Sequence, residues 1–311
     1  MVGRCPRSEI EVAKEKLELV EVSPRDGLQN ESDIVSTENK LALIDHILAA
    51  GFRRLEAGSF VNPKKVPQMA DGDAIFAGVP TRDDATFIAL ALNLRGVERA
   101  LASGAKEINY VFCASDSFSI RNNGGSVDET FNVWPDVAAT AKAGGARLSA
   151  TVSTAFGCPF DGEVPVARVV EVAERCFAEG IFELALADTI GVASPSDVHA
   201  RFRAVKASLP SHVQLRAHFH NTRNTALANA VAAVEEGVRV LDGSLAGIGG
   251  CPFAPGAAGN VPTEDLLYMF NRMGFDTGVD LDRAIEGATF IGGVLGRKTP
   301  GMVSRAPKWP A

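Results

Sequence analysis

The segment FELALADTIGVASPSDVHARFRAVKAS, residues 182–208, contains the structural unit that decides the fold. Its first six residues, Phe182–Ala187, form a short apolar run of the kind that predicts a strand covered on both faces. The segment Pro195–Ser208 then has the composition of a helix, and Asp188 and Thr189 lie between the two elements. Repetition of such a unit predicts a parallel sheet, because each helix carries the chain back to the start of the next strand.

The same unit recurs along almost the whole chain. Seven further apolar runs predict strands, at Leu17–Val22, Arg54–Gly58, Ala85–Leu90, Glu107–Phe112, Arg147–Val152, Gln214–His218 and Arg239–Asp242. Helical stretches separate them, at Thr37–Ala50, Leu94–Ser103, Val127–Ala143, Val164–Ala178 and Asn224–Glu236. Glycines suited to a left-handed helix end follow several of these stretches, namely Gly51, Gly104, Gly144, Gly180 and Gly237.

Eight strand–helix units in roughly 250 residues predict a (β/α)8 TIM barrel of the α/β class. No GxGxxG motif follows the first strand to favour the alternative, a doubly wound sheet. We therefore expect residues 1–311 to form a single TIM-barrel domain, with the barrel over roughly 15–275 and a C-terminal helix and tail over 276–311. The added helix is expected at Leu281–Leu295.

The composition excludes several classes of protein. Of the 311 residues, 46% are apolar and 22% are charged, which is typical of a globular protein, and the formal net charge is −7. The sequence has neither the clustered Lys and Arg of a nucleic-acid surface nor an apolar stretch of about 18 residues for a membrane. The N-terminus has acidic residues unlike a signal or transit peptide, and the five cysteines have no CxxC pair. These features predict a cytoplasmic protein without nucleic-acid or membrane partners.

Candidate metal ligands follow three predicted strands that are neighbours in a closed barrel. His218 and His220 are two residues apart, so their imidazoles point to the same side of a strand. Asp26 follows the first strand and Asn260 lies in the loop after the eighth, so all four side chains could converge. Two nitrogens and two oxygens favour Mg²⁺ or Mn²⁺ over a closed zinc site. The alternative interpretation is a pair of hydrogen-bonded core histidines.

Arg25 directly precedes Asp26, and its paired donors suit a carboxylate or a developing enolate oxygen. An equally good interpretation is a salt bridge from Arg25 to Glu56 or Asp188, which end the second and sixth strands. Either carboxylate could instead anchor the site or accept a proton. The glycine-rich loop that contains Cys251 predicts a lid that presents a thiol for proton transfer or nucleophilic attack.

At these residues the sequence closely resembles the 3-hydroxy-3-methylglutaryl-CoA lyase family of the DRE-TIM metallolyases. The matching blocks are VSPRDGLQNE (22–31), SFVNPKKVPQMAD (59–71), GAKEINYV (104–111), ADTIGVASP (187–195), HFHNT (218–222), ALANA (226–230) and GGCPFAPGAAGNVPTEDLLYM (249–269). The RDG and HxH motifs recur in related synthases and aldolases. The GGCP segment with its downstream GN is specific to the lyases.

The resemblance implies a barrel that binds Mg²⁺ or Mn²⁺ and cleaves (S)-3-hydroxy-3-methylglutaryl-CoA to acetyl-CoA and acetoacetate, as in leucine degradation and ketone body formation. CoA is then part of the substrate, and a homodimer is implied. The metal ligands implied are Asp26, His218, His220 and Asn260. The catalytic residues implied are Arg25 for the enolate, Cys251 for proton transfer, and Glu56 and Asp188 as supporting carboxylates. We assign substrate contacts to Gln29, Ser59 and Thr189, and contacts with CoA to Arg297 and Lys298.

Several points stay open at the level of sequence. The base that accepts the substrate hydroxyl proton is either His218 or Asp188. Asn221 stands where many family members have Asp, and Arg223 replaces an aromatic residue, so a lyase of the same mechanism acting on a related 3-hydroxyacyl-CoA is an alternative. A Claisen synthase that joins acetyl-CoA to a 2-oxo acid is a further alternative, and a non-catalytic barrel is a third.

Overall fold

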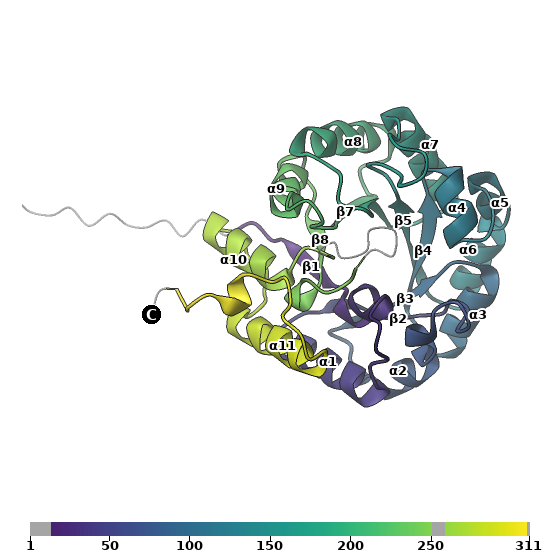
Figure 1. Ribbon diagram of the computed structural model, residues 1–311. Helices are drawn as coiled ribbons and strands as arrows, with labels where there is room; N and C mark the ends of the chain where they lie inside the picture. The colour runs from purple at the N-terminus through teal and green to yellow at the C-terminus, as the bar shows by residue number, and fades with distance from the viewer. Residues whose placement is uncertain (1–13, 251–258, 310–311) are drawn as a thin grey trace, which may run out of the picture.

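The computed structural model describes residues 14–250 and 259–309, and its parallel strands form one closed barrel (Figure 1). The strands, in barrel order, are β1 (Glu18–Glu21), β2 (Arg54–Ser59), β3 (Thr86–Ala91), β4 (Glu107–Cys113), β5 (Arg147–Ser153), β6 (Glu183–Asp188), β7 (Gln214–Phe219) and β8 (Val240–Gly243). The barrel closes because β1 pairs with both β2 and β8. The predicted TIM barrel is confirmed, and every observed strand bound lies within one residue of its prediction.

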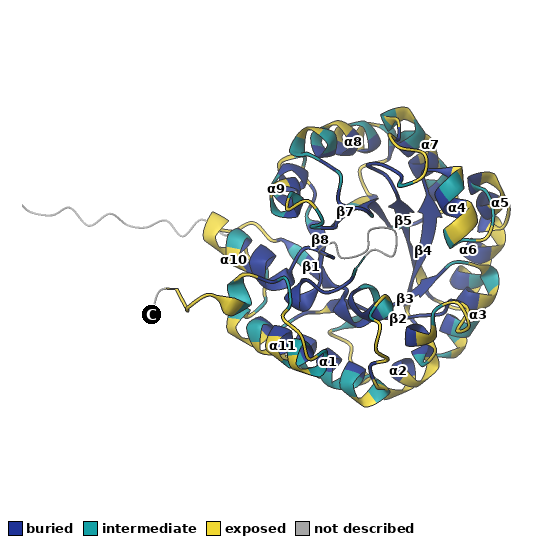
Figure 2. Cartoon of the chain, viewed as in Figure 1, coloured by how far each residue is buried: buried dark blue, intermediate teal, exposed yellow. Residues whose placement is uncertain are grey.

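Helices surround the barrel, and their inward faces are buried against the strands (Figure 2). They are α1 (Thr37–Ala50), α2 (Gly72–Gly78), α3 (Leu94–Ala102), α4 (Asp116–Asn122), α5 (Val127–Asn132), α6 (Trp134–Ala143), α7 (Val166–Phe177), α8 (Pro195–Ser208), α9 (Ala226–Glu235), α10 (Thr263–Met273) and α11 (Leu281–Val294). Local sequence sets several helix ends. The Ser36 hydroxyl accepts a hydrogen bond from the Asn39 amide at the start of α1, and Gly51 ends that helix at φ 104°.

Two details of the helices differ from the predictions. The single helix expected over Val127–Ala143 is instead two helices, α5 and α6, because Pro135 has no amide hydrogen to continue the first one. Gly144 does not adopt the left-handed conformation, with φ at −78°, and Gly145 takes that position with φ at 73°. Helices α2, α4 and α10 were not predicted. Among the described residues, no helix is long and apolar enough to cross a membrane.

The predicted C-terminal helix is α11, which packs against α1 and α10. The chain after it returns to α10, where the carboxylate of Asp265 accepts hydrogen bonds from the amides of Met302 and Val303. The C-terminal segment is therefore fastened to the outside of the barrel, beside α1 and α10 (Figure 1).

The lower end of the barrel interior is filled by an ionic group that we call the barrel floor: Arg54, Glu107 and Glu183, from β2, β4 and β6. The guanidinium of Arg54 donates to Glu183 at 2.6 and 2.8 Å and to Glu107 at 3.2 Å. All three side chains are almost fully buried. Contributions from alternate strands are the usual way in which a TIM barrel fills its interior, so the floor closes the barrel and leaves the opposite end open for a site.

Candidate active site

The predicted metal ligands meet at the carboxyl ends of β1, β7 and β8. Asp26 lies in a π-helical turn, Ser23–Gly27, that directly follows β1. His218 lies at the end of β7 and His220 follows it, paired with Asn260 through an isolated bridge. One ligand atom each from Asp26, His218 and His220 lies within 4.8 Å of the other two. This convergence fits the prediction made from strand adjacency.

The two imidazoles approach Asp26 through the same ring nitrogen. Nε2 of His218 and Nε2 of His220 each lie 3.8 Å from Oδ2 of Asp26. Nδ1 of His218 is occupied, because it forms a 3.0 Å hydrogen bond with Oδ2 of Asp242. Such a carboxylate bonded to the second nitrogen fixes the ring orientation of a metal-binding histidine. The Nε2 lone pairs of both rings are thus directed toward one shared centre.

Asn260 completes the cluster with a different orientation. Its amide nitrogen donates to Oδ2 of Asp26 at 2.7 Å and to the Ile248 carbonyl at 3.2 Å, which identifies this atom as the nitrogen. Its Oδ1 and Nδ1 of His220 are buried and have no hydrogen-bond partner among the described residues. Buried polar atoms without partners are costly, and the unpaired Oδ1 of Asn260, beside a carboxylate and two imidazoles, fits a site for a cation. Asp26, His218 and His220 therefore form a candidate metal site.

Electrostatics prepare these groups for a cation. Burial would raise the pKa of Asp26, but the positive charge of Arg25, together with the neighbouring histidines and the hydrogen bond from Asn260, holds that pKa well below its usual value. Burial and the neighbouring His218 lower the pKa of His220 to about 4, so its imidazole is neutral at pH 7. For His218, burial acts in the same direction, but the hydrogen bond to Asp242 and the charge of Asp26 raise its pKa. An ionised carboxylate and a neutral imidazole are the forms that bind metals.

Arg25 is held between two carboxylates at the edge of the cluster. Its Nε donates to Oε2 of Glu56 at 2.6 Å, and its Nη1 donates to Oδ1 of Asp26 at 2.5 Å. Of the two salt-bridge partners considered, the structure thus selects Glu56. Both oxygens of Asp188 accept hydrogen bonds from the amides of Val192 and Ala193, at 2.9 and 3.0 Å. Asp188 is therefore turned into the loop after β6, not toward Arg25.

A cavity of about 310 Å³ opens over the cluster. The predicted site residues that line it are Arg25, Asp26, Gln29, Glu56, Thr189, His218 and His220. Five further described residues were predicted as site residues and do not line it: Ser59, Asp188, Asn260, Arg297 and Lys298. Ser59 is buried, and Arg297 is exposed and pairs with Glu31 at 2.5 Å. The substrate contacts assigned to Ser59, Arg297 and Lys298 therefore stay predictions.

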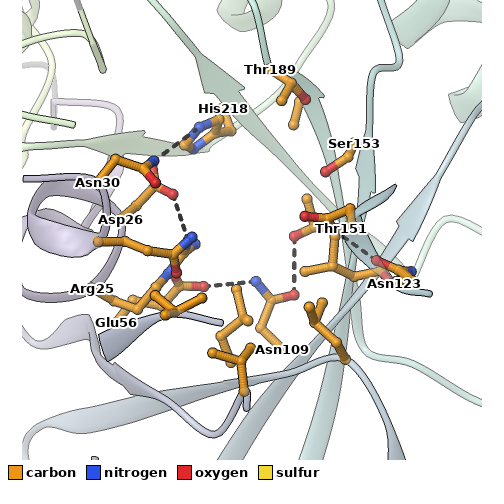
Figure 3. A pocket seen from close by; sticks show the side chains of 18 of the residues that line it. Arg25, Asp26, Asn30, Glu56, Asn109, Asn123, Thr151, Ser153, Thr189 and His218 are labelled. Carbon is orange, nitrogen blue, oxygen red and sulfur yellow. Dashed lines mark hydrogen bonds and ion pairs between the residues drawn. The ribbon is translucent and has the colours of Figure 1, made fainter. Parts of the chain in front are cut away.

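Several polar residues of the cavity wall were missed, among them Asn109, Asn123 and Thr151 (Figure 3) and also Asp242. Asn109 and Thr151 lie on β4 and β5, and Asp242 lies on β8 beside His218. Of these residues, Asp242 could have been predicted from sequence, because it is an acidic residue at the end of a predicted strand adjacent to the strand with the HxH pair. Asn109 shares β4 with Glu107, and Thr151 shares β5 with Ser149 and Ser153, but no sequence spacing connects Asn109 or Thr151 to the rest of the site.

The predicted lid residue Cys251 lies outside the described residues. Just before it, the Gly250 carbonyl accepts a 2.8 Å hydrogen bond from the side chain of Asn30, which also lines the cavity. Gly249 has φ at 111°, and a Cβ there would lie 2.5 Å from the amide nitrogen of Asn260. Glycine is required at position 249 because the loop packs directly on the metal-type cluster.

The two departures from the family pattern, Asn221 and Arg223, lie outside the cavity. Nη1 of Arg223 donates to the carbonyls of Ile190 and Gly191, both at 3.0 Å. Oδ1 of Asn221 accepts a hydrogen bond from the Ala226 amide at 3.2 Å. Both side chains thus bind the backbone of loops after β6 and β7, and they do not contact the space available to an acyl group.

The fold and this cluster define a TIM-barrel enzyme with a candidate metal centre at the carboxyl ends of its strands. The HMGL-like family model matches residues 16–291, so the chain belongs to that family. The mitochondrial hydroxymethylglutaryl-CoA lyase of Mus musculus is 43% identical over 291 residues, covering 94% of this chain and 89% of that protein. The cytoplasmic 3-hydroxy-3-methylglutaryl-CoA lyase of Danio rerio is 43% identical over 94% of this chain and 87% of its own length.

Solved structures agree with this membership. A hydroxymethylglutaryl-CoA lyase from Pseudomonas aeruginosa superposes with a TM-score of 0.90 at 41% identity, covering 94% of this chain and 97% of its own. A second lyase, from Acinetobacter baumannii, was solved with coenzyme A and 3-methylmalate. It superposes with a TM-score of 0.91 at 39% identity, covering 95% of this chain and 96% of its own.

Proposed function

We propose that this enzyme cleaves (S)-3-hydroxy-3-methylglutaryl-CoA to acetyl-CoA and acetoacetate. The observation that carries the proposal is the convergence of Asp26, His218 and His220 beside Arg25, in a chain whose relatives are named as lyases of this substrate. A retro-Claisen cleavage needs a group that activates the substrate hydroxyl and one that meets the charge of the departing enolate. The cluster and Arg25 supply these two requirements in one cavity.

Asp26, His218 and His220 would hold the divalent cation, and we propose Mg²⁺ or Mn²⁺ with Asn260 as a further ligand. When bound, the cation would lower the pKa of the substrate hydroxyl and orient the carbon–carbon bond. As described, the nitrogen of Asn260 faces Asp26, so its part in binding requires the side-chain amide to turn. Arg25 would donate to the thioester oxygen as negative charge develops there, which stabilises the transition state.

The structure supports His218 over Asp188 as the acceptor of the hydroxyl proton. Asp188 already accepts two loop amides, whereas His218 borders the cavity and keeps Nδ1 bonded to Asp242. The proton-accepting atom is then Nε2 of His218. Because one nitrogen cannot hold a cation and a proton together, His218 would accept the proton only where Asp26, His220 and Asn260 hold the cation without it. Cys251 would protonate the enolate of acetyl-CoA, and Glu56 would hold Arg25 in place.

Further parts of the proposal concern binding and location. Gln29 and Thr189 line the cavity and are proposed to contact the acyl group. Arg297 and Lys298 are exposed beyond α11 and are proposed to contact the CoA nucleotide. We also propose a homodimer in the cytoplasm that acts in leucine catabolism, in line with the cytoplasmic relative from Danio rerio.

The direct test is release of acetyl-CoA from a panel of 3-hydroxy-3-alkylglutaryl-CoA thioesters with Mg²⁺ or Mn²⁺. We expect the methyl compound to be the best substrate, and Arg25→Met to lower its turnover by at least about a hundredfold. Cleavage of another thioester in its place would identify the related lyase. Condensation of acetyl-CoA with a 2-oxo acid, without cleavage of any thioester, would contradict the proposed reaction.

A further inference from the structure

A chain of side-chain hydrogen bonds crosses the cavity wall from β5 to the turn after β1 (Figure 3). The Thr151 hydroxyl donates to Oδ1 of Asn109 at 3.0 Å, and Nδ2 of Asn109 donates to Oε1 of Glu56 at 2.7 Å. Oε2 of Glu56 then accepts from Nε of Arg25 at 2.6 Å. The Arg25 guanidinium, which lines the cavity, is thus connected through Glu56 on β2 and Asn109 on β4 to Thr151 on β5.

The direction of this chain is fixed by its charged end. An ionised carboxylate accepts hydrogen bonds but donates none, so the nitrogen of the Asn109 amide must face Glu56. Its oxygen consequently faces β5, and Thr151 must donate to it. Asn109 is 2% exposed and Glu56 is 1% exposed, so water does not replace either partner easily. Each oxygen of Glu56 has one protein partner, and Asn109 is the partner that stops the carboxylate from rotating away from Arg25.

We propose that Asn109 is a positioning residue for catalysis: it holds the Glu56 carboxylate, and through it the guanidinium of Arg25, at the place where the enolate oxygen forms. The inference rests on the proposed lyase function. Arg25 and Asp26 are adjacent in sequence and paired with each other. With Asp26 as its only partner, the guanidinium would move whenever the turn that carries both residues moves. The anchor through Glu56 and Asn109 ties it instead to β2 and β4 of the barrel wall. Fixed donors stabilise developing charge without reorganising, so the anchor acts on turnover.

The alternative is that Asn109 only satisfies the hydrogen bonds of buried polar groups. Two variants, Asn109→Ala and Asn109→Asp, distinguish this structural role from the proposed positioning role. Asn109→Ala removes the donor to Glu56, and we expect kcat to fall about tenfold to a hundredfold while KM changes little. Asn109→Asp has nearly the same shape but can donate to Glu56 only when the introduced carboxyl is protonated. Its kcat should therefore approach the wild-type value at low pH and fall as the pH rises. Charged groups that face the introduced carboxyl are Glu56 on β2 and, beyond Thr151, Arg216 on β7.

Two further variants control for the loss of a buried polar side chain. Thr151→Val removes the donor to Asn109 and should lower kcat less than Asn109→Ala does, and Thr151→Ser should restore it. Ser149→Ala, on the same strand but bonded to Glu107 of the barrel floor, should leave kcat and its pH profile unchanged. The inference is overturned if Asn109→Ala stays within about twofold of wild type, or if Asn109→Asp lacks the pH-dependent recovery.

A crystal structure of Asn109→Ala separates this inference from the proposed function. The kinetic comparisons use whichever thioester the wild-type enzyme cleaves. If the wild type cleaves none of them, the lyase proposal is contradicted, but the positioning role of Asn109 is not. The structure of the variant still decides the positioning role: we expect the Arg25 guanidinium to move by about 1 Å or more, the scale that matters for catalysis. An unmoved guanidinium would overturn the inference whatever the substrate.

Discussion

The floor and the mouth of the barrel are both built from buried charges, but only the floor is saturated. On the floor, all four carboxylate oxygens of Glu107 and Glu183 accept hydrogen bonds from Arg54, and Arg147 adds a further bond to Glu107. At the mouth, Nδ1 of His220 and Oδ1 of Asn260 are buried without a partner among the described residues.

The difference in hydrogen-bond partners distinguishes buried charges that stabilise the fold from buried charges that are available to bind a ligand. A complete set of partners leaves the floor nothing to bind, and its side chains lie at the starts of their strands. The mouth keeps buried polar atoms without partners next to a cavity, which costs stability and is typical of a functional site. The two regions should therefore respond differently to substitution.

The largest expected effect is on the floor. Arg54→Met leaves Glu107 and Glu183 buried without their shared cation, so the free energy of unfolding should fall by about 3–5 kcal/mol. Urea denaturation monitored by circular dichroism measures it. At the mouth, His220→Ala removes a ring that already lacks one partner and should lose less than half as much stability. An equal loss at the two sites would remove the distinction between floor and mouth.

The second effect is on turnover. Cys251→Ala should lower kcat at least about a hundredfold, the usual scale for a positioned proton donor, while metal content stays near that of wild type. Steady-state assays with metal analysis of the same samples measure both quantities. Cys158→Ala is the matched control, because Cys158 is buried within the loop after β5 and does not line the cavity. Near-normal turnover of Cys251→Ala would exclude the thiol from proton transfer.

A smaller effect concerns a buried carboxyl that has no basic partner among the described residues. Burial raises the pKa of Glu264 on α10 to about 7, and only its Oε2 accepts a hydrogen bond, from the Ala246 amide at 3.0 Å. Because the folded-state pKa is raised, the carboxyl favours the folded state most below about pH 4.5, and this contribution is lost as the pH rises through 7. Glu264→Gln should therefore gain stability relative to wild type over this range, on the order of 2 kcal/mol. Denaturation midpoints at pH 4.5 and 8 measure the change, and equal differences at both pH values would contradict it.

Most of the fold could be predicted from the sequence, because each strand and helix is indicated by residues that are close together in the chain. Short apolar runs with polar ends set the strands within one residue. The break between α5 and α6 was missed although Pro135 marks it, because the apolar pattern continues across the proline. The HxH pair and Asp26 were placed correctly, because strand alternation and barrel closure convert sequence spacing into proximity.

The remaining parts of the site depend on side-chain directions that sequence spacing does not carry. Ala187 and Thr189 line the cavity, so alternation turns Asp188 between them to the other side of β6. Asn109 contacts Glu56, which is 53 positions away, and this pairing follows only from the register of β2, β3 and β4. The positions of Arg297 and Lys298 outside the cavity likewise depend on how α11 packs on α1.

The most direct test of the central claim is a calorimetric titration of the metal-free protein with Mn²⁺, comparing wild type with His220→Ala. If Asp26, His218 and His220 share one cation, the wild type should bind one Mn²⁺ per chain in this site, and the variant should lose at least about tenfold in affinity. Unchanged Mn²⁺ binding by His220→Ala would contradict the assignment of these three side chains as ligands of a common ion.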